Sequence, residues 1–112
     1  MMEAGELRAR LARIEALREP ILAGGDAAQR LRRLPDDLVQ TLVAEGFFRF
    51  ALPRELGGED ASSMQTIDVL EALAAIDASV AWNVMLGSEI NAMAAGGMAR
   101  ELAEEVYLAI PV

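Results

Sequence analysis

Hydrophobic residues recur three and four positions apart near the start of the chain, which is the spacing of an amphipathic helix. They stand at Leu7, Leu11, Ile14, Leu17 and Ile21. This stripe predicts a helix over residues 5–22. Pro20 removes an amide hydrogen late in the stripe and two glycines follow it, so we expect the helix to kink or to end there. Asp26 would then cap a short second helix over residues 27–33.

The next predicted helix covers residues 35–45, where apolar residues again follow helical spacing. Pro35 suits its first position, and Gly46 is placed to end it in the left-handed conformation. Residues 47–52 lose the helical period. Apolar side chains there occupy every second position, at Phe48, Phe50 and Leu52. We therefore expect an extended connector that aromatic rings anchor to the core.

Glycine and serine mark the approach to the following helix. A pair of glycines predicts a turn, with its second member, Gly58, at positive φ. Ser62 and Gln65 then form the S-x-x-Q pattern of a capping box, which opens a helix over residues 63–77. Asp77, or the serine two positions later, is a candidate to cap the helix after that.

The most unusual stretch is residues 78–99, where Glu89 is the only charged side chain and apolar side chains fall on every face of a helix. Such a helix is buried in a larger protein or lies in a membrane. Its asparagines and serines argue against a membrane, so we expect a helix over residues 79–95 at the centre of an assembly that this chain cannot enclose by itself. A last helix over residues 98–107 and an extended exit over residues 107–112 complete the prediction.

These elements make one all-α domain, residues 1–112, built as a small bundle of about five helices with one extended connector. A chain of 112 residues fits one domain, and 54% hydrophobic residues are enough for one core. The chain contains no cysteine and no histidine. It therefore lacks the usual nucleophile, general base and metal ligands, so we expect no catalytic residue and no metal site. Zinc enzymes and Ser-His-Asp hydrolases are excluded.

Charge narrows the functional classes further. Ten basic residues, all of them arginine, stand against eighteen acidic ones, for a net charge of −8. That sign opposes binding to nucleic acid, whose phosphates require a positive surface. The acidic start of the chain lacks the features of a signal peptide, and no apolar run reaches the roughly 18 residues of a membrane span. We therefore expect a cytoplasmic protein that binds neither nucleic acid nor a membrane.

Three short motifs in this helical setting carry a resemblance to a known family. Leu34-Pro35 opens a helix that Glu45-Gly46-Phe47-Phe48 closes. After it come Leu52-Pro53-x-Glu55-x-Gly57-Gly58 and, beyond an Ala-rich helix, Asp77-x-Ser79-x-Ala81-Trp82. Over about residues 5–110 the chain resembles the N-terminal helical domain of the acyl-CoA dehydrogenase-like flavoprotein superfamily. The last motif favours the flavin-dependent monooxygenase branch of that superfamily.

The resemblance implies a part in flavin-dependent oxidation. Its relatives continue into a β-barrel domain that holds FAD or FMN and into a C-terminal four-helix bundle, both absent from residues 1–112, and they act on acyl-CoA or aromatic small molecules. In the family, the helix corresponding to residues 79–95 lines the substrate cavity beside the flavin. The positions here that would face or border that cavity are Trp82, Leu86, Glu89 and Ile90. Several hydroxylases of the branch carry a histidine near the position of Ile90, so a histidine-assisted hydroxylation does not carry over.

Two of these residues have a purely structural alternative. Trp82 on an apolar helix suits core packing, and we expect its ring to lie among Leu73, Leu86 and the aromatic cluster of residues 47–50. Its replacement by alanine would then cost ~3–5 kcal/mol. Glu89 is a single carboxylate on a neutral helix and must be paired, exposed or strongly shifted in pKa. We expect the Glu89 side chain to be exposed to solvent.

Two classes of function remain open. The chain is the N-terminal, pocket-forming domain of an acyl-CoA dehydrogenase-like flavin oxidoreductase or monooxygenase, or it is a helical interaction and oligomerisation module without catalysis. In either case we expect residues 1–112 alone to be inactive and to bind no flavin. We also expect the apolar helix to drive self-association or association with the flavin domains.

Overall fold

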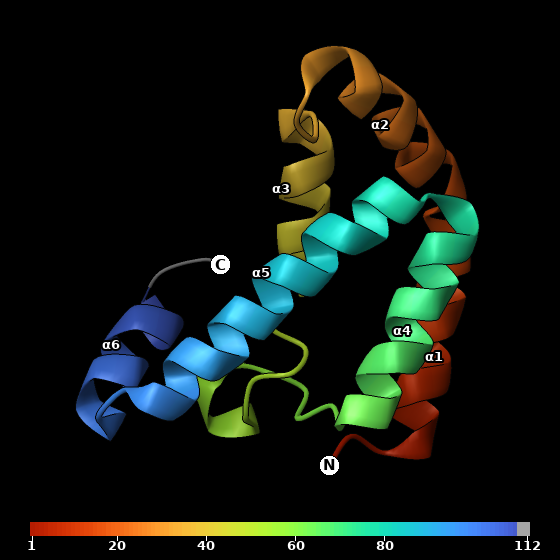
Figure 1. The fold of residues 1–112 in the computed structure, drawn as a ribbon. Helices are drawn as coiled ribbons and strands as arrows, with labels where there is room; N and C mark the ends of the chain where they lie inside the picture. The colour runs from red at the N-terminus through yellow and green to blue at the C-terminus, as the bar shows by residue number, and fades with distance from the viewer. Residues whose placement is uncertain (110–112) are drawn as a thin grey trace.

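The computed structural model describes residues 1–109, and this part of the chain is all helical (Figure 1). Six α-helices and one short 3-10 helix follow one another in this range: α1 (Ala4–Ala16), α2 (Arg18–Leu31), α3 (Asp36–Ala44), η1 (Arg54–Leu56), α4 (Ser63–Ile76), α5 (Ala78–Gly97) and α6 (Arg100–Ala109). The predicted all-α fold is confirmed. None of the helices within residues 1–109 is long and apolar enough to cross a membrane.

The helices form a thin body that measures 40 × 31 × 18 Å. α4 packs along α1, and after Asp77 the chain turns back into α5, which runs diagonally across the molecule (Figure 1). α2 contacts α5 near this turn, and α6 packs against η1 at the far end of α5. A helix with its side chains is about 10 Å across, so a body 18 Å thick has room for less than two full helix layers. In this body one side of α5 stays exposed to solvent.

Buried side chains form two clusters. The larger one gathers residues from α1 to α5 and the connector: Ile14, Leu17, Ile21, Leu34, Leu38, Leu42, Phe47, Phe50, Val69, Leu73, Val80, Ala81 and Val84. The smaller one lies between η1 and α6 and consists of Leu52, Leu56, Ala103 and Tyr107. Asn91 joins them, because its side-chain amide donates to the Phe48 carbonyl at 2.9 Å while its own carbonyl accepts from the Tyr107 hydroxyl at 3.2 Å.

The two helix starts that local sequence patterns predicted are confirmed. At the start of α4, the Ser62 hydroxyl accepts from the Gln65 amide at 3.2 Å and the Gln65 side chain accepts from the Ser62 amide at 2.9 Å, which is a complete capping box. At the start of α5, the Asp77 carboxylate accepts from the Val80 amide at 3.0 Å. Both caps satisfy amides that the first turn of a helix leaves without partners.

The end of α3 follows its prediction as well. Gly46 has a φ of 78°, in the left-handed region that favours glycine. Its amide donates to Val43 at 3.0 Å and the Phe47 amide donates to Leu42 at 3.1 Å, the two hydrogen bonds of a Schellman motif. The pattern of one glycine after an apolar helix was therefore sufficient to place this end.

The connector after α3 differs from its prediction. Residues 47–52 form successive turns rather than an extended segment, with hydrogen bonds such as that from the Leu52 amide to the Arg49 carbonyl at 3.0 Å. In a run of turns alternate residues do not share a side, so Phe47 is fully buried and Phe48 is only partly covered. The expectation that aromatic rings anchor this segment to the core is confirmed; the extended geometry is wrong.

The predicted helix over residues 5–22 is two helices that meet at Leu17. Pro20 does not end a helix, because it lies in the first turn of α2, where an amide needs no partner within the helix. α2 also continues through Gly24 and Gly25 to Leu31, so the short helix over residues 27–33 and its Asp26 cap are wrong.

The two glycines in α2 allow close packing. A Cβ atom on Gly24 would overlap the Leu38 side chain of α3, and one on Gly25 would overlap the Asp77 carboxylate. The sequence interpretation took them as helix-weakening residues. Their role here is to let α2 approach α3 and the start of α5.

Two further expectations are corrected near the turns. Gly57, with φ 84°, adopts the left-handed conformation rather than Gly58. Gly58 instead lies against the backbone of Leu52, where a Cβ would overlap the carbonyl oxygen. α5 extends to Gly97, past the predicted end at residue 95, and α6 continues through the first part of the expected exit over residues 107–112. The rest of that expectation lies outside the described residues.

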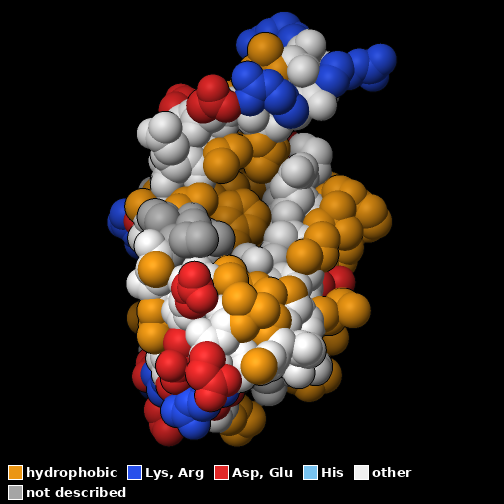
Figure 2. All heavy atoms as spheres, turned by 90° about the vertical axis from the view of Figure 1, so that its left-hand side faces the viewer, with side chains coloured by type: hydrophobic (Ala, Val, Ile, Leu, Met, Phe, Trp, Pro, Cys, Tyr) orange, Lys and Arg blue, Asp and Glu red, His pale blue; other side chains and the backbone are white. Residues whose placement is uncertain are grey.

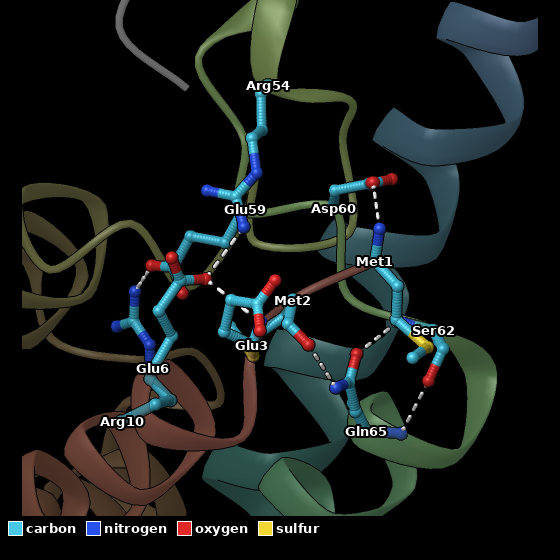
Figure 3. A network of polar contacts seen from close by, with 10 residues as sticks. All are labelled: Met1, Met2, Glu3, Glu6, Arg10, Arg54, Glu59, Asp60, Ser62 and Gln65. Atoms are coloured by element: carbon cyan, nitrogen blue, oxygen red, sulfur yellow. Dashed lines mark hydrogen bonds and ion pairs between the residues drawn. The ribbon is translucent and has the colours of Figure 1, made fainter.

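A network of polar contacts surrounds the start of α1 and joins it to residues 54–60 and to the start of α4 (Figure 3). Arg10 is the central side chain of this region, and only 9% of it is exposed to solvent. Its guanidinium donates to the Glu45 carbonyl at 2.5 Å, forms an ion pair with Glu59 and lies 4.9 Å from the centre of the Phe47 ring. This burial lowers the pKa of Arg10 from its ordinary value.

The same network fixes the first residues of the chain to α4. The Met2 side chain is buried, its amide donates to the Asp60 carbonyl at 2.9 Å, and its carbonyl accepts from the Gln65 side chain at 2.7 Å (Figure 3). Gln65 therefore completes the capping box of α4 and also binds the segment before α1. One residue links a local helix signal to a tertiary contact.

We predict that Gly25→Ala lowers the free energy of unfolding by ~1–2 kcal/mol, because the new methyl group displaces the Asp77 carboxylate from the cap of α5. Gly96→Ala is the matched control, since nothing lies within 4 Å of a Cβ at that position of α5. It should raise the free energy of unfolding by ~0.5 kcal/mol. Urea unfolding measures both, and equal gains in the two variants would contradict the packing role of Gly25.

We also predict a pH dependence from Glu45, whose carboxylate takes three hydrogen bonds from Arg13, the shortest of them 2.6 Å. These bonds lower the pKa of Glu45 below its ordinary value of 4.5 in the folded state. The stabilisation is therefore fully present above about pH 4.5 and is lost as the pH falls through the lower, folded pKa. Glu45→Gln should cost ~1 kcal/mol at neutral pH and nothing in strong acid.

The control for this pair is Glu15→Gln. Glu15 also pairs with an arginine, Arg18, but both side chains are well exposed to solvent, so water screens the interaction. Urea unfolding across an acid titration should show a smaller and flatter effect for Glu15→Gln than for Glu45→Gln. A difference between wild type and Glu45→Gln that persists unchanged into acid would disprove the assignment.

Candidate functional site

Two grooves lie side by side between α4 and α5. Their volumes are about 370 Å³ and about 450 Å³. Both are lined by Ile67 and Leu70 from α4 and by Met85 from α5, so they are two parts of one continuous depression. This depression is apolar enough and large enough to take an apolar small molecule.

The first groove is closest to the turn between the two helices and is almost entirely apolar. Its walls are Ile67, Leu70, Glu71, Ala74, Ala78, Ala81, Trp82 and Met85. Trp82 contributes the one aromatic ring of this groove and Glu71 its one charged group. The groove therefore offers a large hydrophobic surface and a single carboxylate.

The second groove, farther along the helices, carries more polar groups: Ser63, Thr66, Ser88 and Glu89 stand among its apolar lining residues. Two of the hydroxyl groups already donate within their helices, Thr66 to the Ser62 carbonyl at 2.9 Å and Ser88 to the Met85 carbonyl at 3.2 Å. Of these two, the Thr66 hydroxyl is partly exposed and remains an acceptor for a ligand, whereas Ser88 is buried. Glu89 is exposed and is the only charged side chain that lines this groove.

α5 separates the core from solvent. Val80, Val84 and Ser88 stand four residues apart on its inner side and are fully buried. Trp82, Leu86, Ile90 and Met93 share the outer side, and each is at least 40% exposed. An outer side that is also apolar explains the lack of helical amphipathicity in this part of the sequence.

Figure 2 shows hydrophobic side chains in the middle of one face of the molecule, between basic side chains at its upper end and a mainly acidic group at its lower end. Large exposed apolar patches mark sites that contact another molecule.

The four residues proposed from the sequence divide between these surfaces. Trp82 borders the first groove and Glu89 the second. Leu86 and Ile90 line neither groove and lie on the outer side of α5. The expectation that Trp82 packs in the core beside Leu73 is wrong, because its side chain is 59% exposed.

The sequence interpretation missed the contribution of α4 to the site. Ile67, Leu70 and Glu71 face α5 across the grooves. The signal was present, because two helices joined by a single residue form an antiparallel hairpin, and positions at equal distances from that residue lie opposite each other. Glu71 and Trp82 stand at nearly equal distances from Asp77 and meet in the first groove.

A third depression, of about 380 Å³, lies beside α1 and is lined mostly by charged residues. Its charges are paired with one another: Arg13 with Glu45, Arg54 with Glu6 at 2.7 Å, and Arg10 with Glu59. The hydrogen bond from Arg54 lowers the pKa of Glu6. Each charged side chain of this depression therefore already has a partner of opposite charge. This depression is a structural ion-pair network. Among residues 1–109 no group of three or more acidic side chains is placed to hold a metal ion.

Comparison with known proteins gives a family match over nearly the whole chain. The model for the family described as acyl-CoA dehydrogenase, N-terminal domain, matches residues 7–108. A pigment production hydroxylase from Rhodococcus erythropolis is 31% identical over 72 residues, which make up 64% of this chain and 18% of the hydroxylase. The chain thus spans less than a fifth of the length of that relative. No solved structure matches the chain.

We predict that Trp82→Ala changes the free energy of unfolding by less than ~1 kcal/mol, because an exposed ring loses little packing when it is removed. The matched variant is Phe50→Ala. Phe50 is fully buried in the larger core cluster, and its loss should cost ~3–5 kcal/mol. Urea unfolding compares the two, and a Trp82→Ala cost as large as that of Phe50→Ala would place the tryptophan in the core.

Proposed function

The chain belongs to the acyl-CoA dehydrogenase N-terminal domain family, and on this basis we propose that it forms one wall of the substrate pocket in a flavin-dependent oxidoreductase. The observation that carries the proposal is the groove between α4 and α5, with Trp82 at its edge and an uncovered apolar helix face beside it. Binding pockets for small molecules are mostly apolar and commonly lie where domains meet.

We propose the monooxygenase branch of this superfamily. The similar protein from Rhodococcus erythropolis is named a hydroxylase, and the motif over residues 77–82 is typical of that branch. Ile90 stands where several such hydroxylases carry a histidine, and Asn91 after it is held by the Phe48 carbonyl and Tyr107. The side chains of this chain would therefore shape the pocket and exclude water rather than transfer protons.

The residues described here do not fit a role in holding the flavin. Neither groove is lined by a basic side chain that would face its phosphates. Gly58, which a glycine-rich phosphate loop would keep open, is covered by the backbone of Leu52. We therefore assign the binding of FAD or FMN to other parts of the intact enzyme, and residues 1–109 supply the substrate side.

A second function, as an interaction module without catalysis, is favoured by the same exposed face. Trp82, Leu86, Ile90 and Met93 would drive association with another copy or with the flavin domains. The two functions differ in what accompanies the chain in its source. Mass spectrometry of native material that contains residues 1–112 distinguishes a flavoprotein from a protein without a bound cofactor.

In the flavoprotein that contains this chain, we predict that Trp82→Ala raises the KM for substrate about fivefold, which corresponds to the loss of ~1 kcal/mol of aromatic packing. Flavin content should stay unchanged, because this chain does not hold the flavin. Leu108→Ala is the control, since this side chain is equally exposed but lies on α6, away from both grooves. Oxygen-dependent hydroxylation and acyl-CoA dehydrogenation are both assayed. An unchanged KM in the reaction that the flavoprotein catalyses would show that the groove is not part of the substrate pocket.

A further inference from the structure

Acidic side chains supply all the charge in the two grooves. Glu71 lines the first groove, Glu89 lines the second, and no arginine lines either of them. The arginines are concentrated elsewhere, seven of them between residues 8 and 33, on α1, α2 and the loop that follows. Within residues 1–109, neither glutamate takes part in a salt bridge. Both carboxylates are therefore available to a ligand.

This distribution of charge selects ligands by their sign. A ligand carboxylate or phosphate placed in the depression would meet two uncompensated negative charges and no positive one. The net charge of −8 adds to that repulsion over longer distances. A cation in the same place would be attracted by both carboxylates.

The tryptophan adds a second reason to prefer a cation. Trp82 and Glu71 line the same groove from opposite helices. The face of an indole ring attracts a positive charge more strongly than other aromatic side chains do, and ammonium groups are recognised in this way. An aromatic face and a carboxylate on two sides of an apolar groove form a site for an ammonium group attached to an apolar body.

We propose that the depression between α4 and α5 takes an apolar molecule that carries a protonated amine, and that it rejects carboxylates and phosphates. The proposal rests on the function proposed above and narrows its substrate class. It disfavours substrates that would place a carboxylate or a phosphate inside the depression. It favours an arylalkylamine whose ring packs on Ile67, Leu70 and Met85 while its ammonium group lies between Trp82 and Glu71.

The test uses three probes with the same apolar body: phenethylammonium, phenethyl alcohol and phenylpropionate. Each is titrated into the whole chain at neutral pH while the indole N–H signal of Trp82 is followed by NMR, and this signal is unambiguous because the chain has one tryptophan. We expect the ammonium probe to bind about fivefold more tightly than the alcohol, and the carboxylate more weakly than both. Added salt should reduce the difference.

Two variants locate the effect. Glu71→Gln keeps the shape of the groove and removes its charge, so the preference for phenethylammonium over phenethyl alcohol should disappear. Glu101→Gln removes one negative charge at an exposed position of α6 that lines neither groove, so the preference should remain. Loss of the preference in Glu101→Gln would assign it to net charge and overturn the site.

The outcomes separate this inference from the proposed function. Equal binding of all three probes would overturn the selection for cations and leave an apolar substrate groove in place. Absence of binding by every probe would overturn the inference as well, whereas the proposed function is judged by the KM of the intact flavoprotein. Tighter binding of phenylpropionate than of phenethylammonium would reverse the assigned substrate class.

Discussion

The buried guanidinium of Arg10 is the interaction on which the arrangement of this domain depends. It binds the end of α3 through the Glu45 carbonyl, the loop before α4 through Glu59, and the connector through the Phe47 ring. A buried cation without partners costs several kcal/mol, so the three segments can approach α1 only in a geometry that satisfies it. α1 thereby sets the position of the connector, and the connector places Phe50 in the larger cluster and Leu52 in the smaller one.

The thinness of the body leaves one side of α5 exposed to solvent. Its inner side completes the core through Val80 and Val84, and no helix of residues 1–109 covers its outer side. The same helix therefore contributes to stability on one side and offers Trp82 and its neighbours on the other. Gly25 supports this arrangement, because its lack of a side chain lets α2 approach the Asp77 cap where α5 begins.

Where the sequence predicted structure correctly, the signal and the interaction lay within one turn of the chain. The Ser62–Gln65 capping box, the Asp77 cap and the left-handed Gly46 each involve atoms a few residues apart, so residue type and spacing determine them. Where the predictions failed, a distant partner decided. Gly58 was expected to need positive φ, but a glycine is required there because the Leu52 backbone lies too close for a Cβ atom. Phe47 rather than Phe48 is fully buried, because the Phe47 ring faces Arg10 and the core.

The sequence by itself determined the all-α fold, the starts of α4 and α5, the family and the apolar character of the α5 segment. It also located two residues of the grooves, Trp82 and Glu89, through the family motif and the lone charge. It could not decide which side of α5 faces the core, because a helix that is apolar all round carries no pattern to orient it. Only the packing of α4 and the connector against Val84 and Ser88 turned Trp82 outward, and only the hairpin brought Glu71 opposite it.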